Sequence, residues 1–301
     1  MGSGGRRATI AVPYIWLALF FLAPFLIVLK ISLSEAVLAI PPYLPLFGWE
    51  TDTETGKRTA SIFVNPDNYK ALANDGLYLA AFLSSLKIAA ISTLLALAIG
   101  FPMAHAIARA PDRLRHFLLI LVILPFWTSF LIRVYAWIGI LKPEGLLNLA
   151  LINLGITDSA LSILYTNTAV YIGIVYSYLP FMVLPLYANL VRMDRSLIEA
   201  AIDLGCHPLR AFWAITVPLA RPGIAAGCLL VFIPAVGEFV IPDLLGGSDT
   251  LMIGHTLWVE FFNNRDWPLA SAVALVMLVL LLVPLVFLRR HQVRTLDLDG
   301  R

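Results

Sequence analysis

The sequence predicts an all-α integral membrane protein with six transmembrane helices and with both termini in the cytoplasm. Hydrophobic residues make up 60% of its 301 residues and charged residues only 13%, a composition outside the range of soluble domains. Several apolar stretches reach the roughly 20 residues that cross a bilayer as a helix. Basic residues also collect on one side of the predicted helices, as they do in cytoplasmic loops.

The N-terminal half contains three of the predicted spans. Residues 1–9 are polar and basic and predict a cytoplasmic N-terminus, whereas residues 10–29 carry no charge and predict the first span. This apolar run is longer than that of a typical signal peptide, and no small-residue cleavage site follows it. A polar, proline-rich loop with a short helix after Pro66 is predicted for residues 33–78. The second and third spans are predicted at residues 79–108 and 117–141, joined by a short basic loop.

The C-terminal half contains the other three spans. Residues 169–190 carry no charge and predict the fourth span, the fifth begins at Gly223, and the sixth covers residues 269–288. The predicted membrane domain therefore comprises residues 10–288. It includes a polar loop at residues 191–221, and a basic cytoplasmic tail follows at residues 289–301.

The division of charge predicts the orientation of these spans. The side that holds both termini and the loop at residues 191–221 carries thirteen of the 21 basic residues and six of the 19 acidic residues. The spans and the other side hold the remaining eight basic and thirteen acidic residues. Because arginine and lysine favour the cytoplasmic side, this side is predicted to be cytoplasmic.

The loop at residues 191–221 has the pattern of two short helices around a tight turn. Leu197, Ala200 and Leu204 recur at helical spacing and share one face. Gly205 tolerates a positive φ, and Pro208 suits the first turn of a new helix because its missing N–H needs no partner there. The alternative interpretation is an ordinary connecting loop that happens to be helical.

The stretch EAAIDLGCHPLRAFWAITVPL, residues 199–219, resembles the EAA motif of bacterial ABC importer permeases. The resemblance implies the type I ABC importer permease fold, in which cytoplasmic coupling helices dock on a separate ATPase. Val217 stands where the family usually has Leu, a conservative apolar change. The residues that carry the motif, and that the resemblance assigns to ATPase coupling, are Glu199, Ala200, Ala201, Gly205, Ile215 and Pro218.

The chain has no P-loop of its own. No GxxxxGK[ST] sequence occurs, and the cytoplasmic segments are too short to fold as a nucleotide-binding domain. We therefore expect a transport subunit rather than an enzyme, with no catalytic residue, metal site or cofactor on this chain. In the family that it resembles, ATP and Mg are bound by the partner ATPase.

Two ionisable residues fall inside predicted spans, where charges are costly and mark candidate functional sites. Arg133 lies sixteen residues from the cytoplasmic end of span three, and Glu238 lies fifteen residues from that of span five, so both sit about 23 Å along their helices. One hypothesis is a structural ion pair between them. The other is that Glu238 and Asp243, about one turn further out, line an entrance for cations.

Aromatic residues are frequent in the same predicted zone. Trp127, Tyr135 and Tyr176 are candidates for lining the substrate path, where a ring can hold an alkylammonium group by a cation–π contact of about 0.5–2 kcal/mol. The alternative is that they belong to the aromatic belt found at membrane interfaces.

Two further blocks, LPFWTSFLIRVYAWIGIL at residues 124–141 and IPAVGEFVIPDLLGG at residues 233–247, look like those of spermidine and putrescine importer permeases, closest to the putrescine type. The likeness runs over nearly the whole chain. It implies import into the cytoplasm across the bacterial inner membrane by alternating access. It also implies three protein partners besides membrane lipid, and no nucleic acid: a second homologous permease, an ATPase dimer and a periplasmic polyamine-binding protein.

Two other functions remain open at this point. One is an ABC importer permease for another small solute, such as a metal ion, an oxyanion or a modified amino acid. The other is an ion-coupled secondary transporter, which would usually show inverted repeats and would have no reason for an EAA motif.

Overall fold

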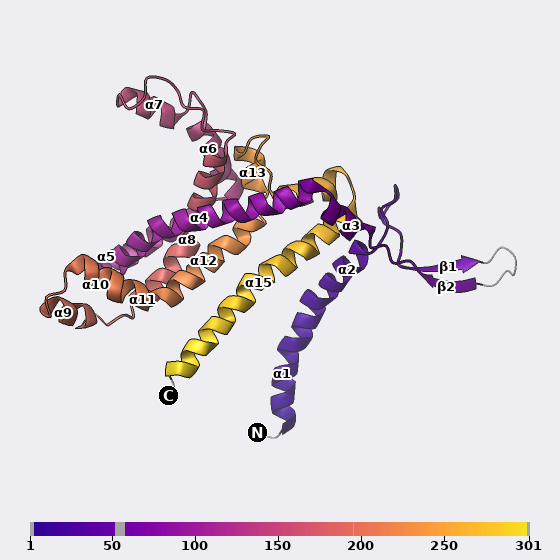
Figure 1. Ribbon diagram of the computed structural model, residues 1–301, viewed down its shortest axis with the longest axis horizontal. Coiled ribbons are helices and arrows are strands. Elements are labelled where there is room, and N and C mark those ends of the chain that lie inside the picture. Colours follow the sequence, from indigo (N-terminus) through magenta and orange to yellow (C-terminus); the bar gives the residue numbers. More distant parts are fainter. Residues whose placement is uncertain (1–2, 52–57, 195, 300–301) are drawn as a thin grey trace. The chain divides into compact units, whose positions relative to one another are not determined.

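The structure is a computed structural model that describes residues 3–51, 58–194 and 196–299 (Figure 1). The predicted terminal segments, residues 1–9 and 289–301, therefore lie partly outside the described residues. The chain divides into two compact units. One is formed by residues 1–80 and 256–283, and the other by residues 81–255 and 284–301.

The first unit contains a long apolar helix near the N-terminus. It is built from α1 (Ser3–Leu17), the π-helical turn η1 (Ala18–Leu22) and α2 (Ala23–Ser32). Its stretch Ile10–Ser32 is 23 residues long and apolar enough to cross a membrane, in agreement with the first predicted span. Most side chains along it are exposed, as expected of a helix whose apolar surface meets lipid or another chain.

The loop that follows contains an antiparallel hairpin that the sequence did not predict. Strands β1 (Phe47–Thr51) and β2 (Arg58–Ile62) pair with Phe47 opposite Ile62. Five-residue strands without a strict apolar alternation give only a weak signal in a sequence. Helix α3 (Asp67–Asn74) then begins directly after Pro66, as predicted, and Oδ1 of Asn65 accepts a hydrogen bond from the backbone N–H of Asp67 (2.9 Å) in an Asx turn.

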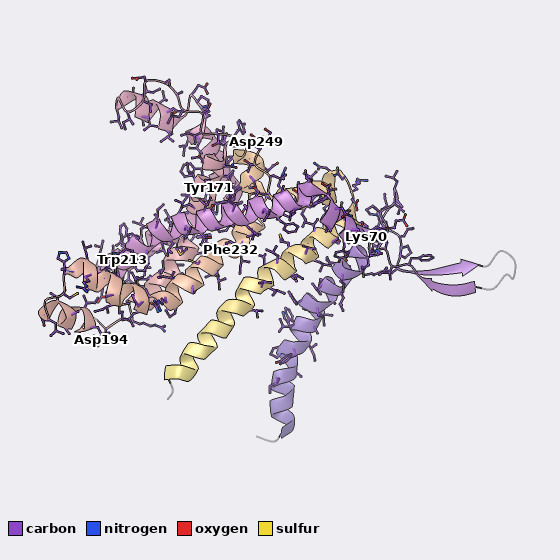
Figure 2. The ribbon with its side chains drawn as sticks, in the orientation of Figure 1. Lys70, Tyr171, Asp194, Trp213, Phe232 and Asp249 are labelled. Atoms are coloured by element: carbon purple, nitrogen blue, oxygen red, sulfur yellow. The ribbon has the colours of Figure 1, made fainter. Side chains whose placement is uncertain are left out.

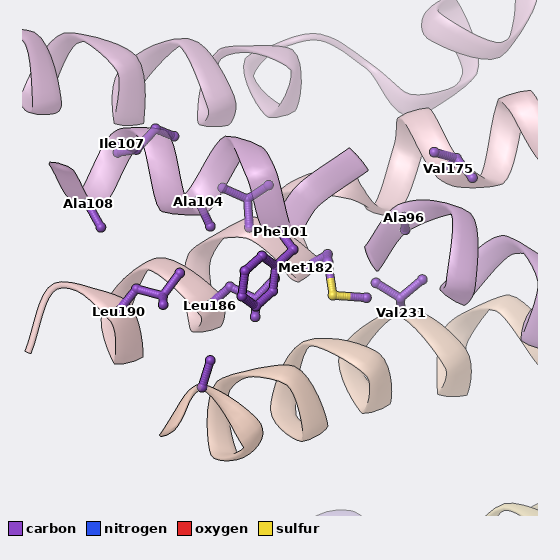
Figure 3. Packing of buried hydrophobic residues seen from close by; sticks show 12 residues of the cluster. Ala96, Phe101, Ala104, Ile107, Ala108, Val175, Met182, Leu186, Leu190 and Val231 are labelled. Carbon is purple, nitrogen blue, oxygen red and sulfur yellow. The ribbon is translucent and has the colours of Figure 1, made fainter. Parts of the chain in front are cut away.

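The second unit is centred on three helices that pack side by side: α4 (Gly76–Arg109), α8 (Asn167–Leu190) and α12 (Arg221–Val236) (Figure 1). They share a buried apolar cluster (Figure 3). The interface between α8 and α12 contains small residues: a Cβ on Gly227 would lie 2.7 Å from Sδ of Met182 and 3.1 Å from its carbonyl oxygen. Glycine thus lets the two backbones approach closely, as in membrane helix pairs with small-xxx-small spacing. The cluster includes Ala96, Phe101, Ala104, Met182, Leu186, Leu190 and Val231.

The third predicted span is broken rather than straight. Helix α5 (Asp112–Ile123) and the 3-10 turn η2 (Leu124–Trp127) are separated by Thr128 and Ser129 from α6 (Phe130–Leu141), which leads to α7 (Leu146–Asn153). The two halves are bent by 93°. Both separating residues have extended backbone, which ends the helical hydrogen-bond ladder. The third predicted span, residues 117–141, is therefore made of two helices joined at a bend rather than of one straight helix.

The segment that contains the fifth predicted span is also bent. Helix α10 (Pro208–Ala211), the π-helical turn η3 (Phe212–Thr216) and α11 (Val217–Leu219) meet α12 at Ala220, with a bend of 66°. Helix α12 ends at Val236, and a short helix, α13 (Val240–Leu245), follows. Helix α14 (Ile253–Trp258), the π-helical turn η4 (Val259–Asn263) and the long α15 (Trp267–Asp299) complete the chain.

The described residues contain three unbroken helices that are long and apolar enough to cross a membrane, or five spans if each bent pair is counted as one. The sixth predicted span coincides with the start of α15, where Trp267–Val283 forms a shorter apolar helix. The structure is therefore helical, as predicted, and six spans with a defined orientation stay a prediction.

Candidate functional site

The EAA segment folds as a helix, a tight turn and a second helix, as predicted. The first helix, α9 (Ser196–Asp203), is preceded by Asp194, whose carboxylate accepts a hydrogen bond from the backbone N–H of Ser196 (2.9 Å). This bond lowers the pKa of Asp194, because it favours the charged carboxylate. The side chain of Asp194 thus caps the N-terminal side of α9 (Figure 2).

Gly205 ends α9 in a Schellman motif. Its φ of +86° lies in the left-handed region, and its N–H donates to the carbonyl of Ile202 (2.8 Å) while the next N–H, of Cys206, donates to the carbonyl of Ala201 (2.9 Å). Glycine adopts this backbone without the steric cost that a Cβ would bring. The turn therefore depends on glycine at the fourth residue of the motif, Gly205.

The second helix starts where Pro208 predicts. His207 is its N-cap, and Nδ1 of His207 accepts a hydrogen bond from the backbone N–H of Leu209 (3.3 Å). The chain then widens into η3, where the N–H of Val217 donates to the carbonyl of Phe212. Pro218, which has no N–H to donate, occupies the first turn of α11.

The EAA segment exposes several large apolar side chains. Leu204 is 89% exposed, and Leu209 and Trp213 are each 67% exposed. Glu199 and Ala200 are also exposed, whereas Ala201, Ile215 and Pro218 are partly buried. A group of large exposed apolar side chains of this kind is typical of a surface that meets another protein.

Glu238 lies in the gap between α12 and α13, and it is only 6% exposed. Its Oε1 accepts hydrogen bonds from the backbone N–H groups of Phe239 (3.2 Å), Val240 (3.0 Å) and Ile241 (3.4 Å). Its Oε2 accepts a hydrogen bond from the hydroxyl of Tyr178 on α8. The carboxylate therefore satisfies the first N–H groups of α13 and ties them to α8.

Arg133 does not pair with Glu238. No ion pair joins them among the described residues, and atoms Nε and Nη1 of Arg133 are buried without a hydrogen-bond partner. The guanidinium lies instead over the rings of Phe126 (5.3 Å) and Phe130 (5.7 Å). The structure therefore does not show the ion pair that was one of the two hypotheses. The equal depth assumed one straight helix from residue 117 to Arg133 and another from residue 223 to Glu238, but Arg133 lies beyond the 93° bend and Glu238 lies beyond the end of α12 at Val236.

Asp243 lies in a different environment from Glu238. Its side chain is 57% exposed, and Oδ1 lies 3.2 Å from Nε2 of His255 on α14. The two carboxylates thus belong to one short segment, but one is buried under α8 and the other faces outward beside a histidine. His255 could not be predicted from the sequence, because its contact with Asp243 joins residues from different helices.

The predicted aromatic residues divide into two groups. Trp127 and Tyr135 are 78% and 58% exposed, whereas Tyr176 is partly buried, with its ring 5.3 Å from that of Trp137. The structure brings a different aromatic chain to Glu238: the ring of Phe181 lies 6.1 Å from Tyr178 and 5.2 Å from Phe126, which in turn contacts Arg133. None of Tyr178, Phe181 and Phe126 was among the site residues predicted from the sequence.

The chain combines three features: apolar helices of spanning length, the ionisable residues Arg133 and Glu238 close to breaks between helices, and an exposed helix–turn–helix. Together they define the class of an integral membrane transport subunit. Residues 96–297 match the family described as "Binding-protein-dependent transport system inner membrane component", and the chain belongs to this family. It is thus a multi-pass inner-membrane permease of an ABC importer, and ATP is bound by the partner ATPase rather than by this chain.

Curated relatives match most of the chain. The spermidine/putrescine transport system permease protein PotB of Escherichia coli K12 is 42% identical over 240 residues, 80% of this chain and 87% of that protein. PotB of Haemophilus influenzae is 39% identical over 276 residues, 92% of this chain and 90% of that protein. A solved bacterial ABC transporter that imports the acidic polysaccharide alginate has the same fold, with a TM-score of 0.69 at 16% identity over 96% of this chain and 94% of that one.

Proposed function

We propose that this permease carries polyamines, putrescine and spermidine, into the cytoplasm. The identity of about 40% to relatives named for spermidine and putrescine supports this substrate class. Preference for putrescine over spermidine is the finer part of the proposal. In such importers the soluble binding protein selects the substrate first, and the permease then offers a path that a flexible dication or trication can follow.

The observation that carries the proposal is the buried carboxylate of Glu238. It is 6% exposed, and none of the ion pairs among the described residues includes it. A buried carboxylate favours a compensating positive charge, and an intramembrane one is costly without it. An amine group of the substrate can supply that charge transiently. Glu238 would then be a transient binding site on the substrate path rather than a member of a permanent ion pair.

The surroundings of Glu238 fit an alkylammonium ion. The hydroxyl of Tyr178 contacts the carboxylate, and the rings of Phe181 and Phe126 continue from Tyr178 at contact distance. Aromatic faces attract ammonium groups, and apolar ring surface suits the methylene chain between them. Asp243, exposed beside His255, and the outward-facing Trp127 and Tyr135 are the proposed outer part of the path, with Tyr176 and Arg133 on its border.

The coupling role is proposed for the EAA segment. Its exposed apolar side chains Leu204, Leu209 and Trp213, together with Glu199, form the surface on which an ATPase subunit would dock. In the proposed orientation, six spans place this segment and both termini in the cytoplasm and Glu238 in the outer half of the membrane. The positive-inside distribution of arginine supports that orientation.

The proposed assembly contains this chain, a second homologous permease, two ATPase copies and a periplasmic polyamine-binding protein. ATP binding closes the ATPase dimer, which moves the coupling helices and turns the permease pair outward; hydrolysis returns it to the inward state. The exposed apolar helices of the chain provide ample surface for the second permease and for lipid.

The proposal is tested by ATP hydrolysis of the complete complex in nanodiscs. We expect binding protein loaded with spermidine or putrescine to stimulate hydrolysis several-fold over unloaded binding protein, in line with coupling free energies of about 1–3 kcal/mol. A complex that hydrolyses ATP and responds to neither polyamine would overturn the substrate class, and the permease for another solute would then be favoured.

A further inference from the structure

Phe212 joins the EAA segment to α4. Its ring centroid lies 5.6 Å from that of Phe101 and 5.5 Å from that of His105, with interplanar angles of 89° and 88°. Phe101 and His105 are four residues apart, so they present their rings on the same face of α4, 6.4 Å from each other and nearly parallel. Phe212 therefore points its ring edge-on against two rings at once, a favourable aromatic geometry.

The turn that carries Phe212 has an inward and an outward face. Ala211 and Thr216 are buried and Phe212 packs against the core cluster, whereas the neighbouring Trp213 is exposed. Consecutive residues of η3 thus contact the core on one side and the proposed ATPase surface on the other. A displacement of the exposed side of η3 would therefore also displace Phe212, which packs against the core within the same helical turn.

Helix α4 packs closely against α8 next to its contact with Phe212. Phe101 belongs to the same buried cluster as Met182 and Leu186 of α8. The neighbouring Gly100 packs so closely that a Cβ there would lie 2.9 Å from Cγ of Met182. Close-packed interiors transmit displacements rather than absorbing them. One turn along α8 from Met182 is Tyr178, the hydrogen-bond partner of Glu238.

We propose that Phe212 is the positioning residue through which movement of the EAA segment reaches α4, acting by its contact with Phe101 and His105. The inference rests on the coupling role proposed above and adds the residue that transmits it. It predicts that truncating Phe212 leaves the ATPase attached and active but disconnects it from the transmembrane helices.

The test uses the complete complex with a spin label on α4, attached at Leu94→Cys, where the side chain is 64% exposed. Cys206 and Cys228 are replaced by serine in all samples. In the otherwise unaltered complex, vanadate trapping of nucleotide should change the label's spectrum. Phe212→Ala should trap the same amount of nucleotide with no spectral change, and import per ATP hydrolysed should fall by about tenfold.

Three variants complete the design. Phe212→Tyr keeps the ring and should behave like the parent, and so should Phe117→Ala, which removes an exposed ring from α5. Phe101→Ala should reproduce the defect, and the double variant with Phe212→Ala should add little to it. An unchanged spectral response and import ratio in Phe212→Ala would overturn the inference, as would loss of trapped nucleotide in proportion to import. Failure of the parent complex to respond to nucleotide at all would instead overturn the coupling role of the EAA segment.

Discussion

The hydroxyl of Tyr178 donates a hydrogen bond to Glu238, while the other oxygen of the same carboxylate accepts from three consecutive backbone N–H groups. One buried side chain thus holds the start of α13 against the middle of α8. Its hydrogen bonds are compatible with an amide as well as a carboxylate, so the structural role and the charge of Glu238 can be separated by substitution.

Glu238→Gln should lower polyamine import by about tenfold or more and leave the complex folded. The amide oxygen can still accept the backbone N–H groups and its NH₂ can face Tyr178, so what is lost is the charge, worth about 1.5–3 kcal/mol in a charge-assisted contact. Import into proteoliposomes and the amount of assembled complex should be measured together. Glu144→Gln, at an exposed position, is the matched control. Import and folded complex falling in parallel would assign Glu238 to packing alone.

Gly205 can be tested through its backbone. Its Cβ would meet nothing within 4 Å, so the only cost of a side chain is the φ of +86°, about 1–2 kcal/mol for most residues. Gly205→Val should lower import per ATP hydrolysed, because the Schellman turn that fixes α9 is strained. Gly205→Asn should retain most coupling, since asparagine tolerates this region. Equal coupling in both variants would show that the turn geometry does not matter for transport.

The close approach of α8 and α12 at Gly227 should make the stability of the protein sensitive to a larger side chain there. Gly227→Ala should lower the thermal unfolding midpoint in detergent, because the new methyl group meets the side chain and backbone of Met182, at a cost of about 1–3 kcal/mol. Gly139→Ala on α6 is the control: a Cβ there meets nothing within 4 Å, and stability should rise slightly. A midpoint for Gly227→Ala at or above the parent value would contradict the packing described here.

Local signals in the EAA segment predicted its structure well, whereas the substrate path depended on contacts that no local pattern encodes. Gly205 and Pro208 have conformational preferences of their own, so the turn and the new helix follow from residue type. Neither residue at the break, Thr128 or Ser129, is a proline or a glycine. The break between η2 and α6 was therefore not predicted from the sequence. The hydrogen bond between Tyr178 and Glu238 joins residues 60 positions apart, so the sequence suggested Arg133 as the partner instead.

The carboxyl of Asp266, at the start of α15, should make the free energy of unfolding depend on pH. Burial raises the pKa of this carboxyl, and so does the nearby Glu260, although the N–H of Leu269 partly offsets them by donating to Oδ1 (2.9 Å). Because the folded-state pKa is raised, the folded protein binds the proton more tightly than the unfolded chain. The contribution of Asp266 is therefore most favourable in acid and is lost as pH rises through the folded-state pKa.

Asp266→Asn removes this titration and keeps an N-cap residue. The free energy of unfolding of the parent, relative to Asp266→Asn, should fall as the pH rises above the ordinary aspartate pKa of about 3.9 and through the raised folded-state pKa. Asp158→Asn, at an exposed position, should follow the parent over the same range. An identical pH dependence for the parent and Asp266→Asn would show that the carboxyl titrates as it does in the unfolded chain.

The central claim is ATP-driven polyamine import through this permease, and it is tested most directly by uptake of labelled spermidine and putrescine into proteoliposomes that contain the complete complex. With the binding protein outside and ATP inside, we predict accumulation that requires both, that is abolished when ADP replaces ATP, and that falls about tenfold in Glu238→Gln. Uptake that follows an ion gradient without ATP, or ATP hydrolysis without uptake of either polyamine, would contradict the account.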